Sequence, residues 1–153
     1  MTNLLRASRT VALKPTSAFD AVLPMPLPEL FRHWYGPIPP VRSTNERSTW
    51  GEVGQQRLVD LVGPGSMRET LILVDRPREF AYQLGEIRGP MAALIVGVTG
   101  RWMFAPEGTG TRITWEWEVT PRSGAAAAMP IFGWLWRGYA VRALHELTSS
   151  LAA

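Results

Sequence analysis

The chain of 153 residues contains no cysteine, a single lysine and only two histidines. Without cysteine it can form neither a disulfide nor a thiolate metal site, and two histidines are too few for a histidine-rich metal cage. We therefore expect no metal and no cofactor. Hydrophobic residues make up 46% and charged residues 19% of the chain, a composition that indicates one globular domain rather than a disordered segment.

Clustered positive charge and long apolar runs are missing as well. The formal net charge is +3, but the arginines that carry it are scattered, whereas nucleic-acid-binding domains usually present a clustered basic face. The longest uncharged stretches, residues 89–100 and 123–136, are shorter than the ~20 residues that cross a bilayer. Residues 1–10 are too weakly apolar for a signal-peptide core. We expect no nucleic-acid partner, no integral membrane segment and a cytoplasmic protein.

Residues 111–119 give the clearest secondary-structure signal. Bulky apolar side chains alternate there with charged and polar ones: Ile113, Trp115, Trp117 and Val119 against Arg112, Thr114, Glu116 and Glu118. Such alternation predicts a strand of an antiparallel sheet with one covered face and one face in water.

The remaining strands are predicted from alternation and from the glycine and proline turns that separate them. They lie at residues 17–23, 52–62, 67–75, 80–84 and 93–104. Residues 27–35 predict a short helix, because Pro28 is tolerated in a first turn and an apolar face follows. Residues 42–48 are expected to form a polar loop, and residues 1–15 an irregular N-terminal lead-in.

The C-terminal segment, residues 123–153, has the only long helical spacing. Its apolar stripe comprises Met129, Phe132, Trp136, Ala140, Ala143, Leu147 and Leu151. Pro130 should kink this helix or mark its true start. The small side chains of residues 124–129 fill little space, so we expect the entrance to any internal cavity beside them.

A series of weak motifs runs through the chain in a fixed order. It consists of Gly54, Arg57, Val59 and Leu61, then Glu69, then Pro77, Phe80 and Tyr82, then Gly89 and Pro90, then Gly100, Trp102 and Phe104, and finally Gly108, Gly110, Thr111, Ile113 and Trp115. This order resembles the helix-grip superfamily, which includes START lipid-transfer domains, the major birch-pollen allergen and bacterial polyketide cyclase/dehydrase-like proteins. The last group is the most similar.

The resemblance implies an α+β fold in residues 16–153, a single helix-grip domain. A curved antiparallel sheet of about six to seven strands would wrap around a long C-terminal helix, with a short helix after the first strand. A cavity for an apolar ligand would lie between sheet and helix. The superfamily shares no single catalytic residue, so the resemblance assigns none here.

Aromatic side chains of the expected inner face are the candidate ligand-binding residues. They are Tyr82, Trp102, Phe104, Trp115 and Trp117 from the sheet, with Phe132 and Trp136 from the helix. Apolar and aromatic walls with a few polar groups are typical of small-molecule pockets. The same side chains could equally pack as core, and the two interpretations do not exclude each other.

Arg57 and Glu69 complete the candidate site. They lie at nearly equal distances from the expected turn at residues 63–65, so they should face each other across a hairpin. Three interpretations stay open: a structural ion pair at the sheet rim, a polar anchor for a ligand's carbonyl or hydroxyl, and a catalytic acid or base at Glu69. Tyr82 could likewise donate a hydrogen bond to a ligand.

No serine–histidine–acid set, phosphate-binding glycine loop or metal-ligand spacing is present. Whether the protein is an enzyme is therefore left open. The leading hypothesis is binding of a hydrophobic small molecule, such as a lipid, polyketide or aromatic metabolite. The alternatives are a cyclase- or dehydratase-type enzyme that uses the same cavity and a protein- or membrane-interaction module without a small ligand. A homodimer is compatible with all three.

Overall fold

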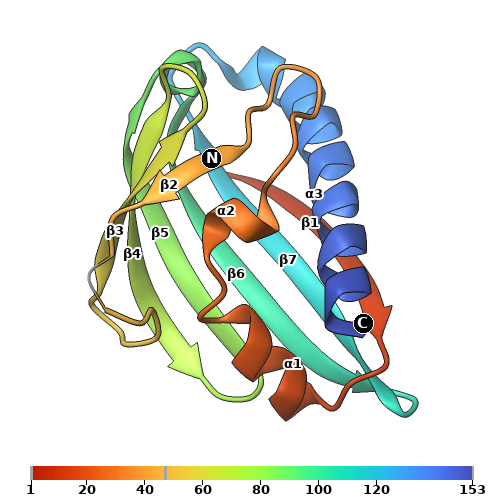
Figure 1. The fold of residues 1–153 in the computed structure, drawn as a ribbon. Helices are drawn as coiled ribbons and strands as arrows, with labels where there is room; N and C mark the ends of the chain where they lie inside the picture. The colour runs from red at the N-terminus through yellow and green to blue at the C-terminus, as the bar shows by residue number, and fades with distance from the viewer. Residues whose placement is uncertain (1, 47, 153) are drawn as a thin grey trace.

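The computed structural model describes residues 2–46 and 48–152, in which seven strands form one antiparallel sheet of order β1-β7-β6-β5-β4-β3-β2 (Figure 1). The strands are β1 (Asn3–Val11), β2 (Val41–Thr44), β3 (Gln56–Leu61), β4 (Ser66–Asp75), β5 (Glu79–Arg88), β6 (Ile95–Glu107) and β7 (Gly110–Pro121). The clearest predicted strand is confirmed as β7, with Ile113, Trp115, Trp117 and Val119 all buried.

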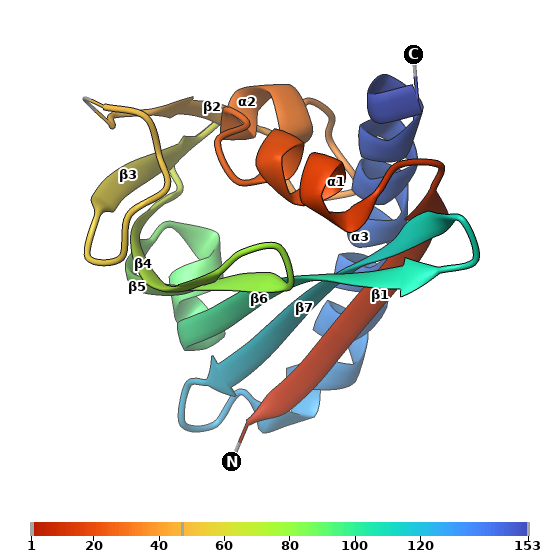
Figure 2. The same cartoon turned by 90° about the horizontal axis from the view of Figure 1, so that it is seen from below.

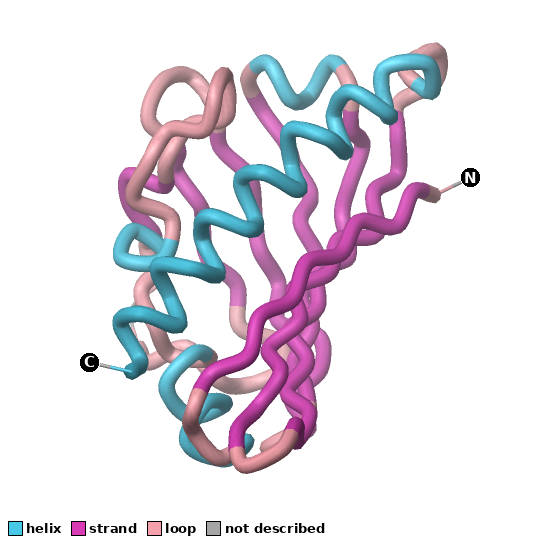
Figure 3. The backbone as a smooth tube through the Cα atoms, turned by 90° about the vertical axis from the view of Figure 1, so that its right-hand side faces the viewer, coloured by secondary structure: helices cyan, strands magenta, loops and turns pink. Residues whose placement is uncertain are grey.

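The helices lie on the concave side of this sheet (Figure 2). They are α1 (Pro15–Val22), α2 (Leu27–Leu30) and α3 (Met129–Ala152), with short 3-10 turns η1 (Pro90–Ala93) and η2 (Ala126–Ala128). The long helix α3 crosses the sheet obliquely (Figure 3), and α1 and α2 close one end. The predicted helix-grip fold is confirmed. Among the described residues no helix has the length and hydropathy needed to cross a membrane.

The first predicted strand, residues 17–23, is wrong, because this segment belongs to the helix α1. Pro15 occupies its first turn, and Ala18, Phe19 and Val22 form its buried face. These positions follow the i, i+1, i+4 spacing of a helix. Strand alternation would place Phe19, Ala21 and Leu23 on one face, but of these three only Phe19 is buried.

The prediction of an irregular lead-in at residues 1–15 is also wrong. Asn3–Val11 forms β1, an edge strand that pairs along its length with β7. Leu5 and Val11 are buried, but Ala7 is small and Arg9 is exposed on the same side of the strand. The apolar alternation is therefore weak, and pairing with β7 determines the strand.

Two smaller predictions need correction around α2. The helix predicted at residues 27–35 ends at Leu30, and the segment predicted as a loop at residues 42–48 begins within β2, Val41–Thr44. β2 is the other edge of the sheet, and Arg42 and Ser43 point to solvent. A short edge strand with polar side chains is hard to tell from a loop by composition.

The long helix α3 packs mainly against β1, which leaves space between the helix and strands β3–β5. Pro130 is the second residue of α3, where its missing N–H costs no hydrogen bond. Of the two predicted alternatives, a kink or the start of the helix, Pro130 therefore marks the start. Gly133 lies against Leu5 of β1, where a β-carbon would come within 3.0 Å of the leucine side chain. At Gly138 the ring and hydroxyl of Tyr35 occupy the space that a β-carbon would need. Gly133 therefore lets α3 approach the β1 edge of the sheet, and Gly138 lets the loop after α2 approach α3.

Candidate functional site

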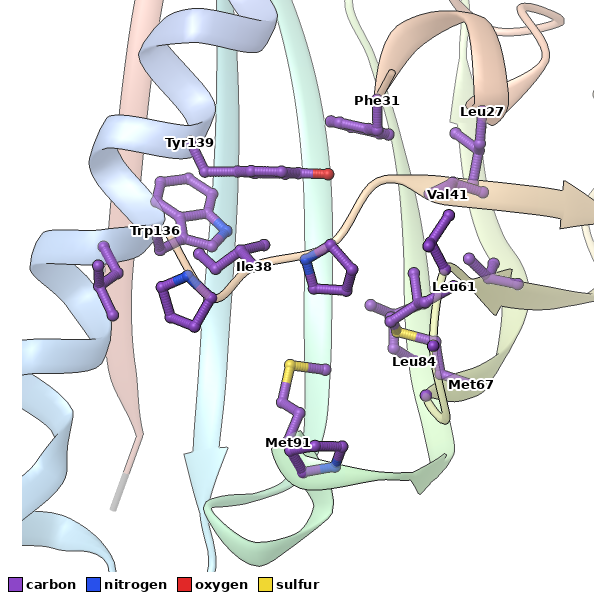
Figure 4. A pocket seen from close by; sticks show the side chains of 18 of the residues that line it. Leu27, Phe31, Ile38, Val41, Leu61, Met67, Leu84, Met91, Trp136 and Tyr139 are labelled. Atoms are coloured by element: carbon purple, nitrogen blue, oxygen red, sulfur yellow. The ribbon is translucent and has the colours of Figure 1, made fainter. Parts of the chain in front are cut away.

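A cavity of about 370 Å³ lies between α3 and strands β3–β5 (Figure 4). Its walls come from α2, the loop of residues 34–39, β2 to β5, η1, β7 and α3. Most of the lining side chains are apolar, among them Leu27, Phe31, Val41, Met67, Leu84 and Met91. A volume above about 300 Å³ with apolar walls is typical of sites that hold small molecules.

Six of the nine predicted ligand-binding residues line this cavity: Glu69, Tyr82, Trp115, Trp117, Phe132 and Trp136. The other three, Arg57, Trp102 and Phe104, are buried but do not line it. The structure therefore brings most of the predicted site together. Contact of these residues with a ligand stays a prediction.

Trp102 and Phe104 belong instead to a packed cluster of rings beneath α1. Phe19 of α1 meets Phe104 and Phe80 edge-on, with ring centroids 5.3 and 5.8 Å apart. Phe80 stacks on Trp102 at 6.4 Å and on Phe104 at 6.1 Å. These two predicted residues pack as core, because Phe19 of α1 covers Phe104, and Trp102 stacks on both Phe80 and Trp115, the latter at 5.3 Å.

The aromatic wall of the cavity is built from β7, α3 and Phe31, the residue that follows α2. Trp115 lies 4.9 Å from the ring of Trp136 and 5.0 Å from Phe31. Phe31 in turn stacks on Tyr139 at 5.6 Å, with 12° between the ring planes. Each ring is held by others, so the wall is rigid before any ligand arrives.

The Tyr82 hydroxyl is a polar group within this apolar wall. Its hydroxyl oxygen accepts hydrogen bonds from the indole N–H groups of Trp115, at 2.8 Å, and Trp117, at 3.0 Å. Its ring lies flat against Gly100, where a β-carbon would come within 2.0 Å of the ring. Burial, with the nearby Glu69 carboxylate, raises the pKa of the Tyr82 hydroxyl well above its usual value. Tyr82 therefore stays neutral at physiological pH.

Arg57 and Glu69 are direct cross-strand partners on β3 and β4, and both are buried. Arg57 Nε donates to Glu69 Oε1 at 3.0 Å and Nη2 donates to Oε2 at 3.4 Å. The Arg57 guanidinium also lies 3.9 Å from the centre of the Trp50 ring, and its Nη1 donates to Glu46 at 3.4 Å. Burial raises the pKa of Glu69 and outweighs the opposing effect of Arg57. Only Glu69 of this pair reaches the cavity.

Several lining residues were missed by sequence reasoning. Leu27, Phe31 and Ile38 come from α2 and the proline-rich loop, and Met91 from η1. Tyr139 lies three residues after Trp136, so helical spacing could have identified it. The others come from segments without strand or long-helix periodicity, and the sequence carries no signal that would place them over the sheet.

With the geometry established, known proteins can be compared. The family model described as polyketide cyclase / dehydrase and lipid transport matches residues 4–152. The chain belongs to this family. A comparison with curated proteins finds no significant match. The resemblance to the cyclase/dehydrase-like group is thereby confirmed, and the match begins within β1, a segment expected to be a lead-in.

Solved structures agree on the fold. The Zhui aromatase/cyclase from Streptomyces sp. R1128 has a TM-score of 0.71 and 13% identity, covering 99% of this chain and 94% of that one. Major latex-like protein 151 from Panax ginseng has a TM-score of 0.72 and 9% identity, covering 99% of both chains. Protein Ms6760 from Mycobacterium smegmatis has a TM-score of 0.67 and 17% identity, covering 98% and 91%. At such identities the likeness shows the fold alone.

The exposed residues of the lining mark the mouth of the cavity. The exposed lining residues are Trp34 and Pro37 of the loop, Gly63 and Pro64 of the β3–β4 turn, and Arg88 and Pro90 beside η1. No residue of the segment 124–129 lines the cavity, and Ala125 and Met129 are buried. The predicted entrance stays a prediction: the segment itself does not line the cavity, but Pro90 and Met91 of the lining belong to η1, whose Ala92 accepts a hydrogen bond from Arg122, two residues before the segment.

The hypothesis of an interaction module rested on residues 89–100 and the start of the long helix. Val96 in the first segment is 51% exposed, and Ile131 and Trp134 in the second are 66% and 69% exposed. Single exposed apolar residues are common on monomeric proteins, whereas interaction sites present contiguous patches. The hypothesis stays a prediction.

Proposed function

We propose that the protein binds a hydrophobic small molecule, such as a lipid, polyketide or aromatic metabolite, in the cavity between α3 and strands β3–β5. The observation that carries this proposal is a largely apolar space of about 370 Å³ with a rigid aromatic wall. Removing apolar ligand surface from water contributes roughly 25 cal/mol per Å². The family's description, which includes lipid transport, supports the same conclusion.

Filling the cavity tests this proposal. Leu84 is buried and lines the cavity, so Leu84→Trp should occupy the space, whereas Val96→Trp adds the same ring at an exposed position outside it. Binding of the fluorescent probe 1-anilinonaphthalene-8-sulfonate is measured for both variants and the parent protein. We expect at least a tenfold loss of affinity for Leu84→Trp only. Absence of binding to the parent protein, or equal binding by all three, would contradict the proposal.

A cyclase- or dehydratase-type enzyme is the second candidate, favoured by the position of Glu69. Glu69 lines the cavity, and burial raises the pKa of its carboxyl group, which is the direction that favours a general acid. One structural neighbour is itself an aromatase/cyclase by name. An apolar cavity could also fold a flexible chain and exclude water.

A short poly-β-keto thioester, whose ring closure releases water, tests the enzymatic candidate. If it is correct, the protein accelerates formation of the cyclic product, measured by mass spectrometry, and Glu69→Gln reduces the rate at least tenfold. Tyr82→Phe keeps the ring and serves as the comparison at the second polar group. A rate equal to that without protein would contradict the enzymatic candidate and leave the binding proposal intact.

The surface charges support the expectation of no nucleic-acid partner. Among the described residues ten arginines lie within 4.0 Å of a carboxylate oxygen: Arg6, Arg32, Arg42, Arg57, Arg68, Arg76, Arg78, Arg101, Arg112 and Arg142. Pairing reduces the positive potential that would attract a phosphate backbone. A cytoplasmic location and a homodimer stay predictions.

A further inference from the structure

The cavity wall contains a hydroxyl group for which residues 2–46 and 48–152 provide no hydrogen-bond partner. This group belongs to Tyr139, which lines the cavity from α3. Its oxygen is not one of the unpartnered side-chain atoms that are closed off from their surroundings, which in the described chain are Glu46 Oε2, Trp50 Nε1 and Trp136 Nε1. The Tyr139 hydroxyl therefore reaches open space, and Figure 4 shows its oxygen directed into the cavity.

Other polar groups of the cavity interior already have partners within the protein. Both carboxylate oxygens of Glu69 accept hydrogen bonds from Arg57. The indole N–H groups of Trp115 and Trp117 donate to the Tyr82 oxygen, and an indole has no second polar atom. These groups help to build the wall, but their hydrogen bonds are made before a ligand arrives.

The Tyr82 hydroxyl keeps a proton of its own to donate, because the two indoles occupy only its oxygen. That oxygen lies down on the sheet, however, where a β-carbon on Gly100 would overlap it. Tyr139 reaches the cavity from the helix and has both its proton and its oxygen available. Of the two phenols, Tyr139 therefore offers a ligand the larger hydrogen-bonding capacity.

Packing fixes the position of the Tyr139 ring. Phe31 stacks on it at 5.6 Å with 12° between the planes, and Trp115 lies 6.4 Å away. Burial, with a smaller contribution from Tyr82, raises the pKa of the Tyr139 hydroxyl, so the proton is present at physiological pH. A donor held in place by its neighbours loses little freedom when a ligand binds, so its hydrogen bond adds to affinity and orientation.

We infer that the Tyr139 hydroxyl donates a hydrogen bond to a carbonyl oxygen of the bound molecule. The ligand class is then a neutral apolar ring compound with a ketone or quinone oxygen. A ring suits the aromatic wall, and a carbonyl accepts a hydrogen bond without bringing a proton that needs an acceptor of its own. An ionised group is disfavoured, because the buried cation Arg57 does not line the cavity. This inference rests on the proposed function, because it needs a ligand in the cavity.

Fluorenone and fluorene form a matched pair of probes, identical in ring skeleton and differing by a carbonyl in place of a methylene. Their dissociation constants are measured by equilibrium dialysis for the parent protein, Tyr139→Phe and Tyr35→Phe. Tyr35→Phe is the matched control, because it removes the same hydroxyl from a ring that packs on Gly138 of α3 but does not line the cavity. The ratio of the two constants is compared between proteins, so differences in hydration of the probes cancel.

We expect Tyr139→Phe to reduce the preference for fluorenone about fivefold, the size of one neutral hydrogen bond, while fluorene binding changes little. Tyr35→Phe should leave the ratio unchanged. An unchanged ratio in Tyr139→Phe, or an equal change in Tyr35→Phe, overturns the inference but not the proposed function. If neither probe binds the parent protein, the inference falls, and binding of 1-anilinonaphthalene-8-sulfonate decides the proposed function separately.

A measurement on the parent protein covers the case in which Tyr139→Phe does not fold. The chain has three tyrosines, so protein labelled with ¹³C at the tyrosine ζ-carbon gives three resonances. Tyr35→Phe and Tyr82→Phe identify the Tyr139 resonance by elimination. Fluorenone should shift this resonance, and fluorene should shift it much less. Equal shifts with both probes, or a fluorenone-specific shift confined to Tyr82, would overturn the inference.

Discussion

Both ends of the concave face are rich in aromatic side chains, but one end is packed solid and the other borders a cavity. At one end Phe19, Phe80, Trp102 and Phe104 pack with ring centroids 5.3 to 6.4 Å apart. At the other, Trp115, Trp117 and Trp136 pack as closely, at 4.9 to 5.8 Å, but also line one side of a cavity of about 370 Å³. The difference lies in what covers the sheet: α1 inserts Phe19, whereas the proline-rich loop of residues 34–39 spans the other end as part of a wall. Aromatic content alone therefore does not distinguish core from pocket.

The sharpest test of this comparison removes one phenyl ring from each end. Phe104→Ala should lower the free energy of unfolding by roughly 3–5 kcal/mol, because it opens a cavity in a packed cluster. Phe132→Ala should cost about 1–2 kcal/mol, because this ring is partly exposed and already borders open space. Chemical denaturation measures both. Equal losses would mean that the two ends are packed alike.

A loss of about 3 kcal/mol is expected when Glu69 is replaced by alanine, because the buried Arg57 then loses its principal partner. The double change Arg57→Met with Glu69→Leu should recover much of this loss, since it removes both charges from the interior. The free energies of unfolding of Glu69→Ala, Arg57→Met, Glu69→Leu and the double variant form the measurement. Additive losses would show that the pair does not act as a unit.

Gly100→Ala tests the support beneath Tyr82. The new methyl group would overlap the tyrosine ring, so the ring must move into the cavity at a cost of about 2 kcal/mol. Gly85→Ala is the control on the adjacent strand, because a β-carbon there meets nothing within 4 Å. We also expect weaker probe binding for Gly100→Ala alone, measured by dialysis. Unaltered binding would indicate that Tyr82 does not shape the cavity.

The smallest effect concerns alkaline pH. Burial raises the pKa of Tyr82 and Tyr139 above the usual value of 10.0, so the folded state retains phenol protons that the unfolded state releases. The stabilisation is complete below pH 10.0 and is lost as pH rises above it. Near-ultraviolet absorbance of tyrosinate follows the ionisation, and Tyr82→Phe and Tyr139→Phe assign it. Ionisation of both residues near their usual value would show that water reaches the cavity wall freely.

Much of the sheet was predictable because its signals are local. The alternation from Ile113 to Val119, the turn at residues 63–65 and the pairing of Arg57 with Glu69 all depend on residues close in sequence. Six of the nine candidate site residues line the cavity, because strand alternation and helical spacing also depend on the local sequence. By contrast, α1 was mistaken for a strand and β1 for a lead-in, since short segments carry ambiguous periodicity.

By itself, the sequence determined which side chains face inward from the central strands and from α3, because the periods of 2 and 3.6 residues follow from backbone geometry. Only the tertiary structure decided which of those side chains enclose a space. That outcome depends on contacts between distant segments: Gly133 of α3 against Leu5 of β1, Tyr35 on Gly138, and Phe19 over Phe104. Such contacts set the distance between helix and sheet, and therefore where the core is filled and where it stays open.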